Sequence, residues 1–303
     1  MKSVVRFHFP QVVFEKQQKK LFNPVLKKRF KNRPEERVRL KWVEYLLHET
    51  DWNRNRISFE SPVSVRQTES TLRADLILYS EELKPKILIE CKSDKVALTG
   101  KTGEQIARYN SDLKAPFLIL SNGVVDLNYE IREKEAVETS KLFSSKPKKF
   151  ERDSNYWSKR GFSGLINSEQ DQEIIPNFLN QFWNDSIQSD IRYLAFKSVH
   201  IDLPIDQYYR IFQADNVTKL AISTVGHSSS ESYLVAVLNQ KGVNRAILYL
   251  NLNKMIENRP DPVLKVSEEG QEIGELKSDI SGYFTGDKEI NITDFSTAVL
   301  KLF

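Results

Sequence analysis

Two acids and a lysine lie in two neighbouring apolar segments of the chain. Asp75 lies within the apolar segment Leu72–Tyr79, and Glu90 and Lys92 follow the apolar run that begins at Ile87. Hydrolysis of a phosphodiester requires neutralised phosphate charge, an activated water and a stabilised leaving oxygen. A hard cation such as Mg²⁺ serves all three needs and prefers oxygen ligands. We therefore interpret Asp75 and Glu90 as ligands of Mg²⁺ or Mn²⁺, with a metal-bound water as the nucleophile.

The residues around Glu90 extend this interpretation. The backbone carbonyl of Cys91 could supply a third oxygen ligand, whereas its thiolate would be a poor ligand for Mg²⁺. Side chains alternate between the two faces of a strand, so we expect Glu90 and Lys92 on one face and Cys91 on the other. Leu88 shares the face of Glu90, so the polar site must open at the end of the strand. Lys92 is a compact charge that can lie near the attacking water and the scissile phosphate.

A polar stretch that follows is predicted to be a helix and contains Gln105 and Tyr109. Residues four apart lie on one helix face, so these two side chains could hold the lysine, a water or the DNA backbone. Other Glu-x-Lys sequences, at Glu82 and Glu275, lack a preceding apolar run. A surface ion pair at a strand end is the alternative interpretation, and the context at Glu90 favours the catalytic one.

Five segments of the first half of the chain carry a family resemblance. They are Arg33–Arg39, Arg73-Ala74-Asp75, Ile89–Lys92, Glu104–Asn110 and Ser121-Asn122-Gly123. The chain resembles the PD-(D/E)XK nucleases, specifically the nuclease domain at the N-terminus of the R subunit of type I restriction enzymes. The Gln-x-x-x-Tyr pair is a further mark of that branch.

The resemblance implies roles for individual residues. Asp75 and Glu90 would bind metal, Lys92 would be catalytic, and an acid of the first helix would assist, Glu36 rather than Glu35. It also implies an α/β (α+β) restriction-endonuclease-like core, with a mixed sheet flanked by helices. Two positions depart from the family pattern: Leu40 replaces a frequent glutamine, and Ser121 replaces a common threonine. Neither departure touches the acids or the lysine.

The elements that would position these residues follow from local patterns. A helix is expected from Pro34 to near Asp51, because Pro and acidic residues suit a first helical turn. We expect strands at 3–14 (broken near Pro10), 57–65 (an edge strand, because of Pro62), 72–79, 86–91 and 117–120. Asn122-Gly123 predicts a turn into a hairpin of 124–131 with 136–142.

The expected organisation is a nuclease-like domain (1–145), a basic linker (146–173), and a helix plus β-rich domain of unknown role (174–303). In the last part, 174–196 has helical spacing and short strands follow. We find no Walker-type loop and no helicase signature, so cleavage would proceed without the motor of type I enzymes, or a partner would bring the protein to its target.

Composition sets further bounds. One cysteine excludes an internal disulfide and a cysteine-based zinc site, and the four histidines show no ligand spacing. There is no apolar run of membrane-spanning length and no signal-peptide core, so we expect a cytoplasmic protein without membrane association. The net charge of +4 divides into +8 for residues 1–200 and −4 for residues 201–303. The basic half contains the proposed site, which suits a polyanionic substrate.

Three hypotheses remain at this stage. The first is a metal-dependent DNA endonuclease in restriction or antiviral defence. The second is a catalytically inactive nucleic-acid-binding or assembly protein with a nuclease fold, and the third is an RNA-directed nuclease. The basic run of residues 16–33 is either a phosphate-contacting arm or an exposed connector. The acidic C-terminal half could form a homodimer or bind a defence-system partner protein.

Overall fold

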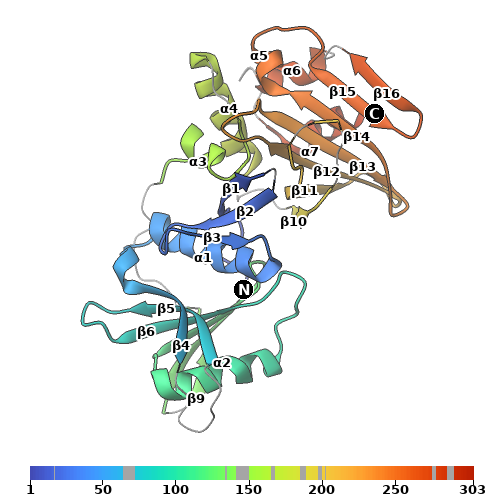
Figure 1. The fold of residues 1–303 in the computed structure, drawn as a ribbon. Coiled ribbons are helices and arrows are strands. Elements are labelled where there is room, and N and C mark those ends of the chain that lie inside the picture. Colours follow the sequence, from blue (N-terminus) through green and yellow to red (C-terminus); the bar gives the residue numbers. More distant parts are fainter. Residues whose placement is uncertain are drawn as a thin grey trace. The chain divides into compact units, whose positions relative to one another are not determined.

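The computed structural model describes residues 1–16, 18–63, 72–133, 135–140, 150–164, 168–184, 189–196, 200–201, 203–274, 278–284 and 290–303. These residues form two compact units, each with its own β-sheet (Figure 1). The first unit comprises Met1–Val13 and Lys20–Glu151, and the second comprises Phe14–Lys19 and Arg152–Phe303.

The first unit is built on a mixed six-stranded sheet of order β4-β5-β6-β7-β8-β9. Only the pair β6–β7 is parallel, and the other neighbours are antiparallel. The strands are β4 (Ile57–Val63), β5 (Leu72–Tyr79), β6 (Pro85–Cys91), β7 (Phe117–Ser121), β8 (Asp126–Arg132) and β9 (Glu135–Glu138), and the helices are α1 (Pro34–Glu49), η1 (Arg54–Arg56) and α2 (Gly100–Leu113). A separate small sheet has the order β1 (Gln11–Glu15), β2 (Gln18–Asn23), β3 (Lys28–Lys31).

Helices α1 and α2 cover opposite faces of the six-stranded sheet. On one face Trp42 of α1 packs in a cluster with Ile87 and Ile89 of β6. On the other face Ile106 of α2 packs with Leu88. Strand β6 is therefore buried on both sides, which explains why its sequence is a continuous apolar run rather than an alternating one.

Most sequence-based expectations for this unit are confirmed. The helix begins at Pro34 and ends at Glu49, and β5, β6 and β7 have the expected positions. Strand β4 contains Pro62 and lies at the edge of the sheet. Residues 64–65 and 141–142, at the ends of two predicted strands, lie outside the described residues.

The expectation for the N-terminus is wrong before Pro10 and confirmed after it. The segment before Pro10 forms turns rather than a strand, and a strand begins only at Gln11. Val5 and Phe9 are fully buried there, so the apolar residues anchor an irregular segment instead of alternating along a strand. The basic run also contains two paired strands, β2 and β3, that were not predicted. The turn between them is stabilised by Asn23, whose side-chain oxygen accepts hydrogen bonds from the Val25 and Leu26 amides.

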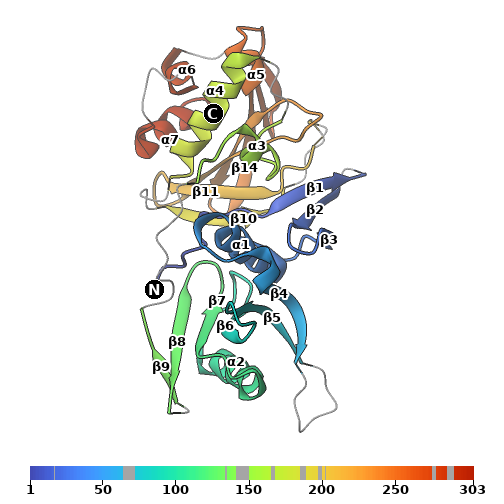
Figure 2. The ribbon, with the colours of Figure 1, turned by 90° about the vertical axis from the view of Figure 1, so that its left-hand side faces the viewer.

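The second unit contains an entirely antiparallel seven-stranded sheet. Its strands, in spatial as well as chain order, are β10 (Asp190–Leu194), β11 (Gln207–Gln213), β12 (Thr218–Val225), β13 (Tyr233–Gln240), β14 (Val243–Asn251), β15 (Val263–Ser267) and β16 (Gly270–Gly274). Its helices are α3 (Ser154–Ser158), α4 (Glu169–Phe182), α5 (Leu252–Ile256), α6 (Ser278–Phe284) and α7 (Ile292–Leu300). Helices α4, α6 and α7 lie together on one side of this sheet (Figure 2).

The predicted helix of residues 174–196 is only partly correct. Helix α4 begins earlier, after Ser168, whose hydroxyl accepts a hydrogen bond from the Asp171 amide, and it ends at Phe182. Residues 190–194 form β10 instead, because they pair in register with β11. Among the described residues, no helix is long and apolar enough to cross a membrane.

The segment interpreted from its charges as a basic linker contains packed structure from Arg152 onwards. Asp153 caps α3 by accepting a hydrogen bond from the Tyr156 amide at 2.7 Å. Trp157 is fully buried and its ring meets that of Phe162 at 5.4 Å. The aromatic residues of this polar stretch are thus core residues of the second unit.

Trp157→Ala should lower the free energy of unfolding of the second unit by about 3–5 kcal/mol, because it removes a large, fully buried aromatic side chain. Urea denaturation followed by circular dichroism measures this change. Val217→Ala, at a half-exposed position, is the control and should change stability by less than about 0.5 kcal/mol. Equal stability of the two variants would show that residues 152–164 do not contribute to this core.

Candidate catalytic site

The pairing of β5 with β6 places two carboxylates side by side. Leu76 pairs with Ile89, so Asp75 and Glu90 come next on the two antiparallel strands. The Cys91 amide donates a hydrogen bond to Asp75 Oδ2 at 2.7 Å, which ties the end of one strand to the other. Asp75 is 8% exposed and Glu90 is 3% exposed. The sheet therefore buries two acids side by side, Glu90 near the end of β6 and Asp75 next to it within β5.

Lys92 lies on the same side as Glu90, as strand alternation predicts. Its Nζ is 2.7 Å from Glu90 Oε1 and 3.8 Å from Glu35 Oε1 of α1. The Lys92 amide donates to the Ser121 carbonyl of β7, which fixes the backbone beyond the end of β6. Cys91 points the other way and is fully buried in the cluster beneath α1. The lysine therefore bridges the acid of β6 and the first turn of α1.

Helix α1 brings a guanidinium to the same acids. Arg39 Nη2 is 2.7 Å from Asp75 Oδ1, and its Nη1 donates to Glu36 Oε2 at 2.9 Å. The guanidinium also lies over the Phe59 ring at 5.2 Å. Sequence analysis assigned no role to Arg39. The spacing of three from Glu36 is a signal for that ion pair, but the contact with Asp75 depends on the tertiary fold.

The two acids in the first turn of α1 have different surroundings. The resemblance implies Glu36 rather than Glu35 as the assisting acid, which stays a prediction. Glu36 is buried and paired with Arg39, whereas Glu35 is half-exposed and is the acid that approaches Lys92. The Gln105 and Tyr109 side chains lie outside the described residues, although α2 itself covers the sheet face that carries Glu90.

Burial shifts the protonation of all three groups at the end of β6. Burial, and then the charge of Asp75, raises the pKa of Glu90 to about 7. Burial also raises the pKa of Asp75, while Arg39 and the Cys91 amide oppose that shift. Burial disfavours the charged form of Lys92, but its hydrogen bond to Glu90 and the nearby acids outweigh this and raise its pKa. The acids are thus short of positive charge, which a bound cation would supply.

The donor set fits a hard divalent cation. The candidate ligands are carboxylates of Asp75 and Glu90 and the Cys91 carbonyl, all of them oxygen donors, which Mg²⁺ and Mn²⁺ prefer. Within the described ranges, no group of three or more His, Cys, Asp or Glu side chains is arranged to hold a metal ion. Mg²⁺ commonly binds through one or two carboxylates, and water fills its remaining positions.

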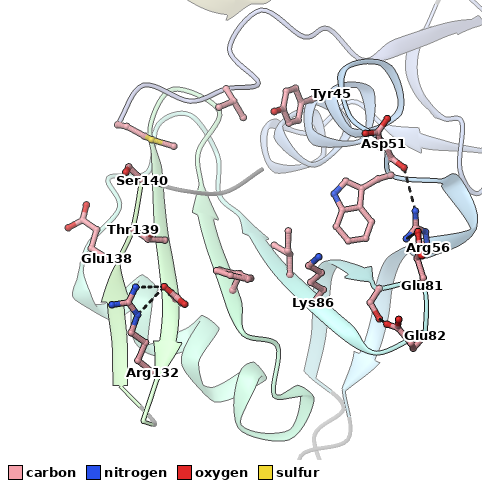
Figure 3. A pocket seen from close by; sticks show the side chains of 17 residues that line it. Tyr45, Asp51, Arg56, Glu81, Glu82, Lys86, Arg132, Glu138, Thr139 and Ser140 are labelled. Carbon is pink, nitrogen blue, oxygen red and sulfur yellow. Dashed lines mark hydrogen bonds and ion pairs between the residues drawn. The ribbon is translucent and has the colours of Figure 1, made fainter. Parts of the chain in front are cut away.

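A cavity of about 1500 Å³ lies at the other end of β6 (Figure 3). Lys86 and Ile87, at the start of the strand, line it, together with the aromatic rings of Trp52 and Phe117. The acids of its lining outnumber the bases; the acids are Asp51, Glu81, Glu82, Glu130 and Glu138, and the bases are Arg56, Lys86 and Arg132. Its charge does not suit a nucleic acid, and the cluster of Asp75, Glu90 and Lys92 lies at the opposite end of the strand.

Residues 34–142 match a family model described as the type I restriction enzyme R protein N terminus. This confirms the resemblance inferred from the motifs, and the matched segment contains Asp75, Glu90, Lys92 and Arg39. No curated protein matches the chain, and no solved structure matches it either.

Arg39→Met should lower the free energy of unfolding of the first unit by about 3–5 kcal/mol, because it leaves Asp75 and Glu36 buried without their cation. Urea denaturation in EDTA measures the change. Arg37→Met, on the same helix, is the control. Adding Asp75→Asn to Arg39→Met should recover part of the loss, and a single variant as stable as the wild type would contradict the role of this ion pair.

Lys41, on the same helix, gives a pH-dependent prediction. It is 6% exposed, and its Nζ donates to the Arg6 carbonyl at 3.0 Å. Burial lowers the pKa of Lys41 from the ordinary lysine value of 10.5 to about 7, and the charge of Asp94 opposes this shift. Between these two pH values the unfolded chain binds more protons than the folded protein, so stability rises with pH.

Lys41→Met should therefore stabilise the protein most below pH 7. Its advantage over the wild type should shrink by up to about 1.4 kcal/mol per pH unit above that pH. Urea denaturation at a series of pH values measures the difference, and the exposed Lys219→Met is the control. An advantage that stays constant with pH would contradict the shifted pKa of Lys41.

Proposed function

We propose that the first unit is a metal-dependent endonuclease that hydrolyses phosphodiester bonds of DNA, in restriction or antiviral defence. Its fold would be a restriction-endonuclease-like core. The observation that carries the proposal is the cluster at the end of β6, where Lys92 Nζ lies 2.7 Å from Glu90 Oε1 and Arg39 joins Asp75 to Glu36. The match of residues 34–142 to the N terminus of a restriction enzyme subunit supports restriction as the biological setting and DNA as the substrate.

In this proposal Asp75 and Glu90 hold Mg²⁺ or Mn²⁺, with the Cys91 carbonyl as a further oxygen ligand. When bound, such a cation neutralises phosphate charge and makes water a better nucleophile. Lys92 orients the attacking water and stabilises negative charge on the phosphate as the phosphorus–oxygen bond breaks. Glu35 lies within reach of Lys92 and holds it toward the site. Gln105 and Tyr109 would contact the lysine, a water or the DNA backbone.

The second candidate function is a nucleic-acid-binding protein that retains the fold without catalysis. The specific observation in its favour is that each carboxylate oxygen of Asp75 already accepts a donor, from Arg39 and from the Cys91 amide. A carboxylate has about four lone-pair sites, however, so both contacts leave room for a cation. The two functions differ in whether divalent metal ions bind at Asp75 and Glu90.

Lys92→Ala should reduce the nicking of supercoiled plasmid in Mg²⁺ or Mn²⁺ by about 100-fold or more, because it removes a charge that acts on the phosphate. Gel electrophoresis of the plasmid over time measures the rate, and EDTA should abolish the reaction. Lys86→Ala is the matched control, because this exposed lysine lies at the opposite end of the same strand. It should cut at the wild-type rate.

Two outcomes would contradict the proposal. The first is equal cutting by Lys92→Ala and Lys86→Ala. The second is absence of cleavage by the wild type together with absence of Mn²⁺ binding in calorimetry, which would leave the non-catalytic function. Cleavage of RNA but not of plasmid would transfer the proposal to an RNA substrate.

A further inference from the structure

The β2–β3 hairpin concentrates positive charge on one exposed segment. Residues 16–34 contain eight basic residues and no acidic one. The structure separates these bases, because Lys19 is buried and belongs to the second unit, whereas the bases of the turn and of β3 are exposed. The exposed ones are Lys27, Lys28, Arg29, Lys31 and Arg33. From Lys20 onwards the basic run therefore forms a paired hairpin of the first unit rather than an exposed connector, and its interpretation as a phosphate-contacting arm stays a prediction.

The pairing within the hairpin determines which of its side chains face the core. Leu21 pairs with Phe30, and both pack against the core, where Phe30 meets Phe59 at 5.7 Å. Side chains alternate along strands, so Lys20 and Lys31, which pair directly, lie on the outer face. Like charges directly opposite each other destabilise a sheet. A folded hairpin that retains such a pair has a surface suited to binding an anion.

The turn of the hairpin is held in a fixed conformation. Lys27 has a φ of 53°, a left-handed conformation that few residues other than glycine adopt. The Asn23 side chain accepts two backbone amides of the turn, and the Arg54 guanidinium donates to the Pro24 carbonyl. The bases at the tip are thus presented by a rigid turn rather than by a flexible loop.

The hairpin leads directly into the proposed catalytic site. Arg33 is the residue before α1, and the Asn32 side chain accepts a hydrogen bond from Arg37 of that helix at 2.9 Å. Lys31 and Glu35, which approaches Lys92, are four residues apart in sequence, so at most about 14 Å of chain separates them. Duplex DNA rises about 3.4 Å per base pair, so this span corresponds to about four base pairs.

We infer that the exposed basic residues of the turn and of β3 in the β2–β3 hairpin bind the phosphate backbone of duplex DNA, within a few base pairs of the bond cut by the Lys92 site. The inference rests on the proposed function for its placement beside a scissile bond. Exposed lysine and arginine side chains neutralise phosphates without reading the sequence, so this surface would fix the position of the duplex and not its sequence specificity.

The test compares two variants that each lose three lysine charges. The hairpin variant carries Lys27→Gln, Lys28→Gln and Lys31→Gln. The control variant carries Lys219→Gln, Lys241→Gln and Lys301→Gln, at exposed positions of the second unit. Binding of a fluorescent duplex of about 25 base pairs is measured in EDTA, where no cutting occurs, between about 50 and 200 mM KCl.

The hairpin variant should bind the duplex about tenfold more weakly or worse, and its slope of log affinity against log salt should fall by about 2.7, because each lost phosphate contact removes about 0.9. The slope of the control variant should differ from the wild-type slope by less than about 0.9, the value for one phosphate contact. Thermal melting should show no loss of stability for the hairpin variant, because Lys31→Gln relieves the Lys20–Lys31 repulsion.

Equal salt slopes of the two variants would overturn the inference. So would tighter binding of duplex RNA than of DNA through the same lysines. The fate of the proposed function is read separately, from plasmid nicking in Mg²⁺. Hairpin-dependent binding without nicking contradicts the nuclease and leaves the surface intact, whereas nicking with hairpin-independent binding contradicts the surface alone.

Discussion

The burial of two carboxylates, Asp75 within β5 and Glu90 near the end of β6, is the constraint on which the rest of the first unit depends. Asp75 and Glu90 are removed from water, so their charges require cations held at hydrogen-bond distance. Arg39 of α1 and Lys92 beyond β6 supply them. Helix α1 can deliver Arg39 only if the helix is fixed over the sheet, which the burial of Trp42 and Leu46 achieves. Packing of the core and geometry of the site are thus set by the same helix.

The two faces of β6 divide the tasks of this strand. Ile87, Ile89 and Cys91 point into the cluster beneath α1, and Leu88 points toward α2. Glu90 is two residues after Leu88 and therefore points to the same side of the sheet, near the end of the strand. A charged residue can follow the apolar run there. Parallel pairing with β7 requires the chain to cross over between the strands, and α2 provides that crossover. All six strands of this sheet lie within residues 34–142, the segment that matches the family model.

Sequence patterns predicted the helices and strands that are determined by neighbouring residues. They failed where contacts between residues distant in the chain determine the structure. The run before Glu90 and the first turn at Pro34 were recognised from neighbouring residues alone. The role of Arg39 was not, because its contact with Asp75 joins residues that are far apart in the chain. Strands β2 and β3 were not recognised because both are short and lysine or arginine occurs on both faces of the hairpin, so the apolar residues do not alternate cleanly with polar ones. Similarly, the burial of Trp157 was not recognised because its neighbours in the sequence are polar. The side chains of Gln105 and Tyr109 lie outside the described residues, so their predicted roles stay predictions.

The position of Cys91 has a consequence for observing the site. It is the only cysteine of the chain, it is fully buried, and burial raises the pKa of its thiol well above the ordinary value. A thiol reagent can react with it only when the end of β6 separates from α1. The rate of labelling in the native protein therefore measures how often this strand opens, in the same way that amide exchange measures local unfolding. The chain carries an internal reporter of local opening beside Glu90, without any engineered label.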